Sequence, residues 1–232
     1  MNSQFLLITV TIVVCLFIPL NPGFCEKTNT PQGTKKLDEI HNIVQTIVQH
    51  IRDQNTEKAL AFMMDMQNLW QAFTGYHEET FAGELNPPDG MDELLSGITG
   101  DIGELEHNLK AGNFSESLGK AQVLLDAITS LNKKMSLPIL FDFTGPKCKS
   151  CKVMKARLTE VAPDFTGKVR IVLVDVNVQK DFTRKFKIML IPTLIFIDKT
   201  GTEISRHVGQ MEEPAIRAEL ADLMERSGPE KR

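Results

Sequence analysis

At 232 residues the chain is longer than an average domain and can hold two modest ones. Its composition, 42% hydrophobic and 24% charged, is that of a globular protein, and a formal net charge of −4 argues against nucleic acid as a partner. The charge is unevenly divided. Residues 26–135 carry nine Lys or Arg against seventeen Asp or Glu, whereas residues 136–232 carry seventeen against thirteen. Opposite signs indicate two domains that attract one another or meet differently charged partners, unless the two solvated surfaces simply differ.

Residues 1–25 are predicted to be a cleaved signal peptide. Residues 5–20 are an uninterrupted apolar run, close in length to a signal-peptide core and short for a membrane span. Gly23 and Cys25 place small residues at the −3 and −1 positions of a cleavage site. No Lys or Arg precedes the run, so an uncleaved membrane anchor is the alternative. We expect an exported protein, and the overall pattern favours the bacterial periplasm.

A helical bundle domain is predicted for residues 36–135, after a flexible polar lead-in at residues 26–35. Four segments repeat apolar residues at alternating intervals of three and four, which places them on one helix face. Two short connections and one longer one favour an antiparallel four-helix bundle. The segments are residues 37–51, 56–73, 95–109 and 118–135, with a loop at residues 76–90.

Several residues are expected to bound these helices. Thr56 and Asp89 are predicted N-caps of the second and third helices, and Asn113 with Glu116 resembles a capping box before the fourth. Gly75 occupies a position where a C-terminal cap would end the second helix.

A different periodicity distinguishes the remaining part, predicted as an α/β domain over residues 136–228. Short β-branched runs replace the helical stripes, and a turn at residues 198–201 joins the last two into a hairpin. The predicted order β-α-β-α-β-β-α gives a mixed central sheet with flanking helices. The elements are strands at 138–143, 169–176, 192–197 and 203–208, and helices at 148–161, 182–187 and 214–224.

Cysteine usage indicates redox chemistry. The chain has four cysteines, and cleavage after Cys25 would remove Cys15 and Cys25 and leave only Cys148 and Cys151. A C-x-x-C pair in an otherwise thiol-free exported chain is typical of a redox unit. Two cysteines cannot complete a four-ligand zinc site alone, and Lys152 stands where covalent haem attachment needs a histidine. We therefore predict no metal and no cofactor.

The element order, with C-x-x-C between the first strand and the first helix, resembles the thioredoxin family over residues 136–226. The resemblance implies a thioredoxin fold and a thiol–disulfide oxidoreductase. It rests on the motif Cys148-Lys149-Ser150-Cys151, on Asp142 six residues earlier, on Ile191-Pro192-Thr193 at the family's cis-proline segment, and on two late glycines, Gly201 and Gly209.

The resemblance also implies roles. Cys148 would be the nucleophile, and Cys151 would resolve the mixed disulfide and form the Cys148–Cys151 disulfide. Asp142 would accept the proton of Cys151, with a pKa raised by burial. The alternative for Asp142 is a polar residue with satisfied hydrogen bonds at a strand end. A cis Pro192 would place its neighbours Ile191 and Thr193 where they bind an extended substrate chain.

The surroundings of Cys148 are basic. A helix N-terminus favours an anion, and Lys147, Lys149 and Lys152 add positive charge, so we expect a lowered thiol pKa at Cys148. A lysine between the cysteines favours an oxidising protein, whereas Ile191 is what reducing members of the family carry. Leu173 also stands near a position where the family keeps a lysine. The direction of electron flow therefore stays open.

The bundle resembles no family we can name. His41, His50, His77 and His107 lack the spacing of a metal site and are predicted to lie on the surface. Met63, Met64 and Met66 near Trp70 are predicted to fill the core, with a copper-binding or client-binding patch as the alternative.

We expect the protein to reduce or exchange disulfides of exported proteins. A reductase outside the cytoplasm would also need a membrane electron-transfer partner. Two other functions fit the sequence: a non-catalytic binding or assembly module on a thioredoxin scaffold, and a copper-handling thiol protein.

Overall fold

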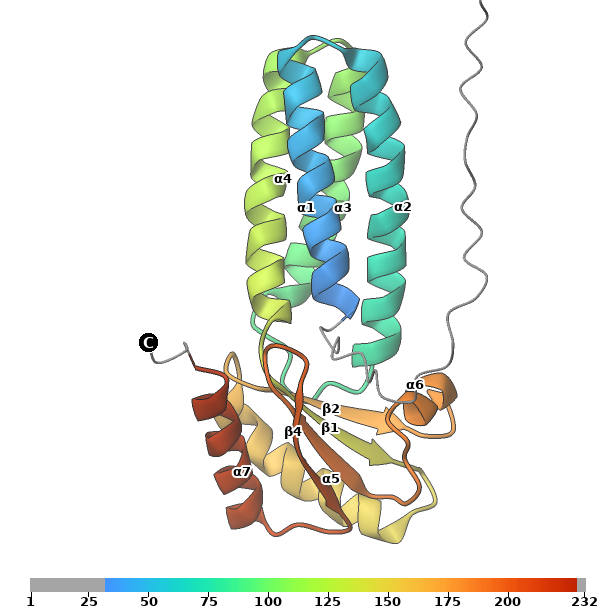
Figure 1. The fold of residues 1–232 in the computed structure, drawn as a ribbon, viewed down its shortest axis with the longest axis vertical. Coiled ribbons are helices and arrows are strands. Elements are labelled where there is room, and N and C mark those ends of the chain that lie inside the picture. Colours follow the sequence, from blue (N-terminus) through green and yellow to red (C-terminus); the bar gives the residue numbers. More distant parts are fainter. Residues whose placement is uncertain (1–31, 229–232) are drawn as a thin grey trace, which may run out of the picture.

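The computed structural model describes residues 32–228, in which a four-helix bundle stands end-on upon an α/β domain (Figure 1). The bundle comprises α1 (Gln32–Arg52), α2 (Thr56–Phe81), α3 (Met91–Lys110) and α4 (Phe114–Met135). The signal peptide predicted at residues 1–25 lies outside the described residues. The lead-in predicted at 26–35 ends earlier than expected, because α1 begins at Gln32. Within residues 32–228, no helix combines the length and apolarity needed to cross a membrane.

The apolar stripes that predict the bundle face its interior. On α2 the side chains of Met63 and Trp70 are buried, whereas Phe62 and Leu69, which also recur at helical spacing, are only partly buried. Trp70 also donates a hydrogen bond from Nε1 to Thr99 Oγ1 of α3, at 3.0 Å. Met63 and Met66 fill the core as predicted, but the prediction for Met64 was wrong, because its side chain is 65% exposed. The side chains buried from α1 are Leu37, Ile40, Val44, Ile47 and Ile51.

Two predicted boundaries of α2 were wrong. Asn55, not Thr56, caps the helix, since its side chain accepts the Lys58 N–H at 3.2 Å. The helix also continues through Gly75 to Phe81 instead of ending there. A helical glycine costs about 1 kcal/mol relative to alanine. Burial of Thr80 and Phe81 in the following turn outweighs that cost.

The other two predicted caps also differ. Gly90, with φ of 68°, is the N-cap of α3, one residue after the predicted Asp89. A positive φ favours glycine, which explains the choice of residue. Asn113 occupies the N-cap position of α4, but its side chain makes no capping hydrogen bond.

The α/β domain is a four-stranded mixed sheet, as the element order predicts, and its strands lie in the order β2-β1-β3-β4. β1 pairs in parallel with β2 and antiparallel with β3, and β3 and β4 form the predicted hairpin. The strands are β1 (Ile139–Thr144), β2 (Arg170–Asp175), β3 (Thr193–Ile197) and β4 (Glu203–Val208). The helical segments are α5 (Lys149–Val161), η1 (Ala162–Phe165), α6 (Lys180–Lys185) and α7 (Glu213–Arg226).

Both faces of the sheet are buried, each against different helices. Leu140 and Leu194 face α5 and α7 in one apolar cluster. Phe141 and Phe143, the alternate residues of β1, face α6 and belong to the same cluster as the bundle core. The bundle and the sheet therefore share one continuous hydrophobic core.

The loop between α2 and α3 pairs with the outer edge of β2. Leu85 N donates to Ile171 O at 2.8 Å, and Leu173 N donates to Gly83 O at 2.9 Å. A side chain at position 83 would not fit, because its Cβ would lie 2.1 Å from Leu173 O. The side chain of Asn86 extends the pairing by accepting the Ile171 N–H at 2.8 Å. An otherwise open sheet edge is thus covered by a segment of the bundle domain.

Arg170, the first residue of β2, lies fully buried at this junction. Its guanidinium binds both carboxylate oxygens of Glu84, each at 2.6 Å. The guanidinium carbon lies 3.6 Å from the centroid of the Phe81 ring, and Nη1 lies 3.0 Å from the sulfur of Met135. One side chain therefore contacts the ends of α2 and α4 and the connecting loop.

We predict that Glu84→Gln lowers the free energy of unfolding by about 3–5 kcal/mol, because it leaves a buried guanidinium without its counter-charge. Denaturant unfolding of the purified protein measures this change. Asp181→Asn, which breaks the exposed pair with Arg184, is the matched control and should change stability by less than about 0.5 kcal/mol. A Glu84→Gln effect as small as that of the control would contradict the assignment.

Of the four histidines predicted to lie on the surface, His107 is exposed, whereas His41, His50 and His77 are half-buried. The ring of His77 lies 5.2 Å from that of Phe81 and 6.2 Å from that of Phe73, and its Nε2 has no hydrogen-bond partner in the described structure. Burial, reinforced by the positive charge of Arg170 and opposed by Asp92, lowers the pKa of His77 to about 4. The neutral ring is thus the form that the folded state accommodates.

This lowered pKa predicts a loss of stability in mild acid. The unfolded chain takes up a proton near pH 6.5 and the folded chain only near pH 4, so stability present above pH 6.5 is lost as the pH falls towards 4. His77→Phe should flatten the dependence of Tm on pH over that window. His107→Phe, at an exposed position, should leave the profile of the parent unchanged. Parallel profiles for parent and His77→Phe would refute the prediction.

Candidate active site

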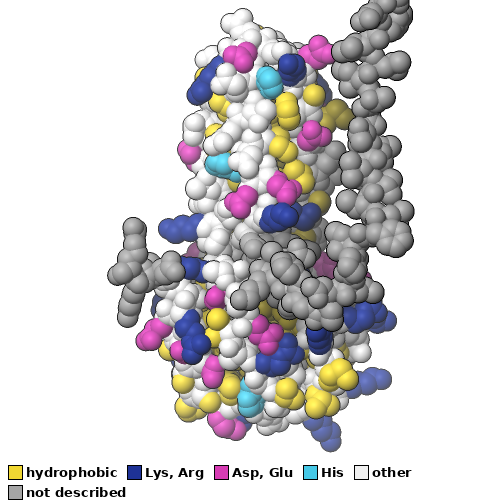
Figure 2. All heavy atoms as spheres, in the orientation of Figure 1, with side chains coloured by type: hydrophobic (Ala, Val, Ile, Leu, Met, Phe, Trp, Pro, Cys, Tyr) yellow, Lys and Arg dark blue, Asp and Glu magenta, His cyan; other side chains and the backbone are white. Residues whose placement is uncertain are grey.

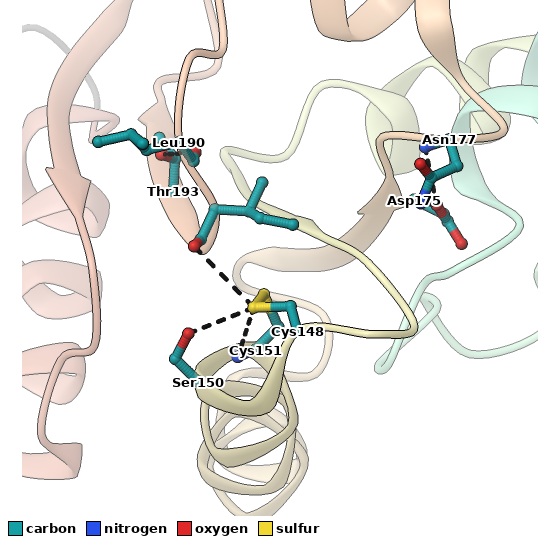
Figure 3. Close-up of a disulfide and its surroundings, with 8 residues drawn as sticks. Cys148, Ser150, Cys151, Asp175, Asn177, Leu190 and Thr193 are labelled. Atoms are coloured by element: carbon teal, nitrogen blue, oxygen red, sulfur yellow. Dashed lines mark hydrogen bonds between the residues drawn. A yellow bond between two sulfur atoms is a disulfide. The ribbon is translucent and has the colours of Figure 1, made fainter.

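Cys148 and Cys151 form a disulfide at the N-terminus of α5 (Figure 3). Cys148 is the N-cap residue, and its sulfur accepts the Cys151 N–H at 3.1 Å. The Ser150 hydroxyl lies 3.2 Å from the same sulfur. Cys148 is partly exposed, whereas Cys151 is buried. The outer sulfur is therefore the accessible one, and the helix N-terminus supplies donors that would stabilise its thiolate.

A second loop lies against the disulfide. The Ile191–Pro192 peptide is cis, as expected from the resemblance, and the Ile191 carbonyl oxygen lies 3.9 Å from Cys148 Sγ. Gly209, with φ of 104°, donates its N–H to Pro192 O at 2.8 Å. Gly145 closes the contact from the other side, because an added Cβ there would lie 3.1 Å from Ile191 Cδ1.

Thr193 does not present its side chain to a substrate. The residue is 2% exposed, and its hydroxyl donates to Leu190 O at 2.7 Å. The expectation that Thr193 contacts substrate therefore holds at most for its backbone. Its side chain instead fixes the turn that precedes β3, which orients the carbonyl of Ile191.

Asp142 lies in the middle of β1 with no exposed surface. It alternates with Phe141 and Phe143 and so lies on the face of the sheet that α5 covers. Neither carboxylate oxygen has a hydrogen-bond partner among the described residues, in contrast to what the alternative of a satisfied polar group requires. Desolvation raises the pKa of Asp142 to about 7, as expected. A carboxyl with this pKa can take up and release a proton near neutral pH.

The lysines around the motif are all exposed. No ion pair joins Lys147, Lys149 or Lys152 to a carboxylate in the described part of the chain, and the first turn of α5 contains no acidic residue. Their positive charges are therefore not neutralised by a carboxylate and can act on Cys148 and on a bound substrate.

Sequence reasoning missed a cavity of about 640 Å³ beside Cys151. Its walls come from three parts of the chain: the end of α2, the segment that precedes the motif, and the end of β2. Residues that line it include Glu79, Gly83, Pro146, Lys155, Asp175 and Val178. No local pattern announces this cavity, because Glu79 belongs to the bundle and Pro146 to the α/β domain.

An exposed apolar turn beside the disulfide was also missed. Met189 and Leu190, directly before Ile191, are 89% and 65% exposed. The signal available in the sequence was that these two apolar residues belong to no periodic pattern. Within residues 32–228, no group of three or more His, Cys, Asp or Glu side chains could hold a metal ion.

Comparison with known proteins identifies the family. The family model named Thioredoxin matches residues 122–222. Thioredoxin from Haemophilus influenzae is 40% identical over 75 residues, which are 69% of that protein and 32% of this chain. Thioredoxin from Alicyclobacillus acidocaldarius is 33% identical over 88 residues, 83% of that protein and 38% of this chain. The chain belongs to the thioredoxin family.

The thioredoxin domain is accordingly a thiol–disulfide oxidoreductase, with the disulfide at the start of α5. A solved structure of the germline-specific thioredoxin Deadhead from Drosophila melanogaster is also similar, at 20% identity and a TM-score of 0.36, over 93% of that chain and 43% of this one. The family match begins inside α4, so α1, α2 and α3 lie outside it.

The raised pKa of Asp142 makes stability fall with rising pH. The unfolded carboxyl ionises near 3.8 and the folded one near 7, so its contribution is intact below pH 3.8 and lost as the pH rises to about 7. Asp142→Asn should therefore stabilise the protein at pH 8 by a few kcal/mol, since one pKa unit corresponds to about 1.4 kcal/mol. Unfolding at pH 4 and pH 8 measures the difference.

The control for Asp142→Asn is Asp175→Asn at the half-buried end of β2, where the carboxylate already accepts the Asn177 N–H at 2.8 Å. Its effect should be a loss of stability and not a gain at pH 8. If Asp142→Asn failed to stabilise the protein at pH 8, the buried carboxyl would not be the group described.

Proposed function

We propose that this protein is an extracytoplasmic oxidoreductase that reduces or exchanges disulfides of exported proteins through Cys148-Lys149-Ser150-Cys151. The observation that carries the proposal is the outer sulfur of Cys148 at a helix N-terminus, 3.9 Å from the Ile191 carbonyl. Export is supported by the apolar run at residues 5–20 and by the lack of cysteines beyond residue 25 other than this pair.

In the reducing direction the dithiol form reacts in two steps. The Cys148 thiolate attacks one sulfur of the substrate disulfide, so that a mixed disulfide forms and the other substrate sulfur leaves as a thiolate. Cys151 then attacks Cys148 Sγ, which closes the Cys148–Cys151 disulfide and releases the second substrate thiolate. The substrate gains two electrons and the protein loses two. A dithiol donor, in this compartment a membrane electron-transfer partner, restores the protein by the same exchange in reverse.

Asp142 serves the second step. Cys151 is buried and must lose its thiol proton before it can attack. A carboxyl on the covered face of the sheet, with a pKa of about 7, is matched to accept that proton at neutral pH. Neither oxygen of Asp142 has a hydrogen-bond partner among the described residues, which leaves both able to accept the proton.

The positive charge around Cys148 stabilises the reduced form, because a thiolate is an anion and a disulfide is neutral. Lys147, Lys149 and Lys152 are exposed and unpaired in the described structure, so their effect opposes the reducing tendency expected from Ile191. The reduction potential decides between the two. A value near about −270 mV indicates a reductase, and one near about −120 mV indicates an oxidant or isomerase.

We predict that Cys148→Ser abolishes turnover of a disulfide peptide, whereas Cys151→Ser accumulates a mixed disulfide at Cys148. The first variant lacks the nucleophile, and the second lacks only the resolving thiol. Mass spectrometry of each variant after mixing with the peptide checks both results. Turnover by Cys148→Ser, or the absence of any reversible disulfide in the parent, would leave the non-catalytic binding module as the better interpretation.

A further inference from the structure

A basic surface borders the disulfide on the α5 side. Lys149, Lys152 and Lys155 recur every three residues along the first two turns of α5, and Lys147 directly precedes Cys148. All four are exposed. Residues three apart lie next to one another on a helix surface, so these side chains form a continuous group, here called the lysine face.

The lysine face has no internal counter-charge. No ion pair of the described residues includes any of its four lysines, whereas Arg157, on the following turn, is paired with Glu212 at 2.8 Å. The first acidic residue of α5 is Glu160. Glu79 and Asp175 line the cavity that Lys152 and Lys155 also line, but neither carboxylate lies within ion-pair distance of these lysines.

The opposite side of the disulfide is apolar. Met189 and Leu190 are strongly exposed there, and Val208, paired with Thr193, is 53% exposed. Figure 2 shows that Lys and Arg side chains and apolar side chains lie next to one another at the lower right of the α/β domain. A partner that reaches Cys148 must therefore pass between a basic surface and an apolar one.

We propose that the lysine face selects protein segments in which acidic residues flank the reacting cysteine. The inference rests on the proposed function, since only a cysteine-bearing partner can exchange with Cys148. A carboxylate-rich segment would otherwise be repelled by the Cys148 thiolate, and the lysines offset that repulsion. Complementary charge at the rim of a site mainly raises the association rate and excludes wrongly charged partners.

The test compares three disulfide peptides that differ only in the four residues that flank the reacting cysteine. These residues are Asp and Glu in the acidic peptide, Asn and Gln in the neutral peptide, and Lys in the third. The pre-reduced full chain reacts with each at pH 7, and the second-order rate constant is measured. At low salt the acidic peptide should react about tenfold faster than the neutral one, and the Lys peptide slower. At 0.5 M salt the differences should largely vanish, because screening shortens the range of the charges.

The double variant Lys152→Gln/Lys155→Gln should lower the ratio of acidic to neutral rates about threefold or more. The ratio is the readout because both peptides meet the same sulfur, so any change in thiolate reactivity cancels. Lys58→Gln/Lys133→Gln, at two exposed lysines of the bundle, removes the same charge elsewhere and should leave the ratio unchanged.

Each other outcome is decisive. Equal rates for acidic and neutral peptides at low salt overturn the inference and leave the oxidoreductase function standing. Reduction of none of the peptides overturns both. Salt-sensitive binding to phosphatidylglycerol vesicles without any peptide preference would assign the lysine face to a membrane surface and would likewise overturn the inference.

Discussion

The buried pair of Arg170 and Glu84 is the interaction on which the architecture depends. A guanidinium removed from water is tolerated only when its charge and its donors are matched, and here two carboxylate oxygens, the Phe81 ring and the Met135 sulfur surround it. Those contacts come from the ends of α2 and α4 that lie nearest the sheet and from the loop that follows α2. The position of β2 relative to the bundle is thereby fixed by charge as well as by apolar packing.

The geometry of the active site depends on this position of β2. β1 is paired with β2 along its whole length, from Ile139 with Arg170 to Thr144 with Asp175. The register determines which residues of β1 face α5 and hence that Asp142 is directed into the covered side of the sheet. The segment after β1 then brings Cys148 to the start of α5, against the carbonyl of Ile191. Backbone pairing of the bundle's loop with β2, and of β2 with β1, thus connects the bundle to the redox-active disulfide.

Features encoded by neighbouring residues could be predicted from the sequence. The helical stripes, the β-α-β-α-β-β-α order and the helix start at Cys148 all follow from local periodicity and spacing. The cis bond at Pro192 and the raised pKa of Asp142 followed from the family resemblance and from the physics of burial. These are properties that a residue carries with it or shares with a short segment.

Features that depend on distant segments could not be predicted. Gly75 looks like a helix end until the burial of Phe81 beyond it is known. Arg170 reads as an ordinary strand residue, and nothing near it in the sequence reveals Glu84 as its partner. His77 and the cavity beside Cys151 likewise arise where the bundle meets the sheet. The sequence also did not reveal that the Thr193 hydroxyl donates a hydrogen bond within its own turn.

The strand-like segment at Gly83 has a consequence for how the molecule can be divided. The place where the sequence changes character, near residue 136, is not a place where the fold can be cut. A fragment that begins there would retain every residue of the redox motif yet lack the segment that covers β2, and it would leave Arg170 without its carboxylate. A bundle merely linked to a thioredoxin domain would leave two domains that could be separated. Here the segment at residues 83–85 pairs with β2, so the catalytic unit extends backwards to the end of α2.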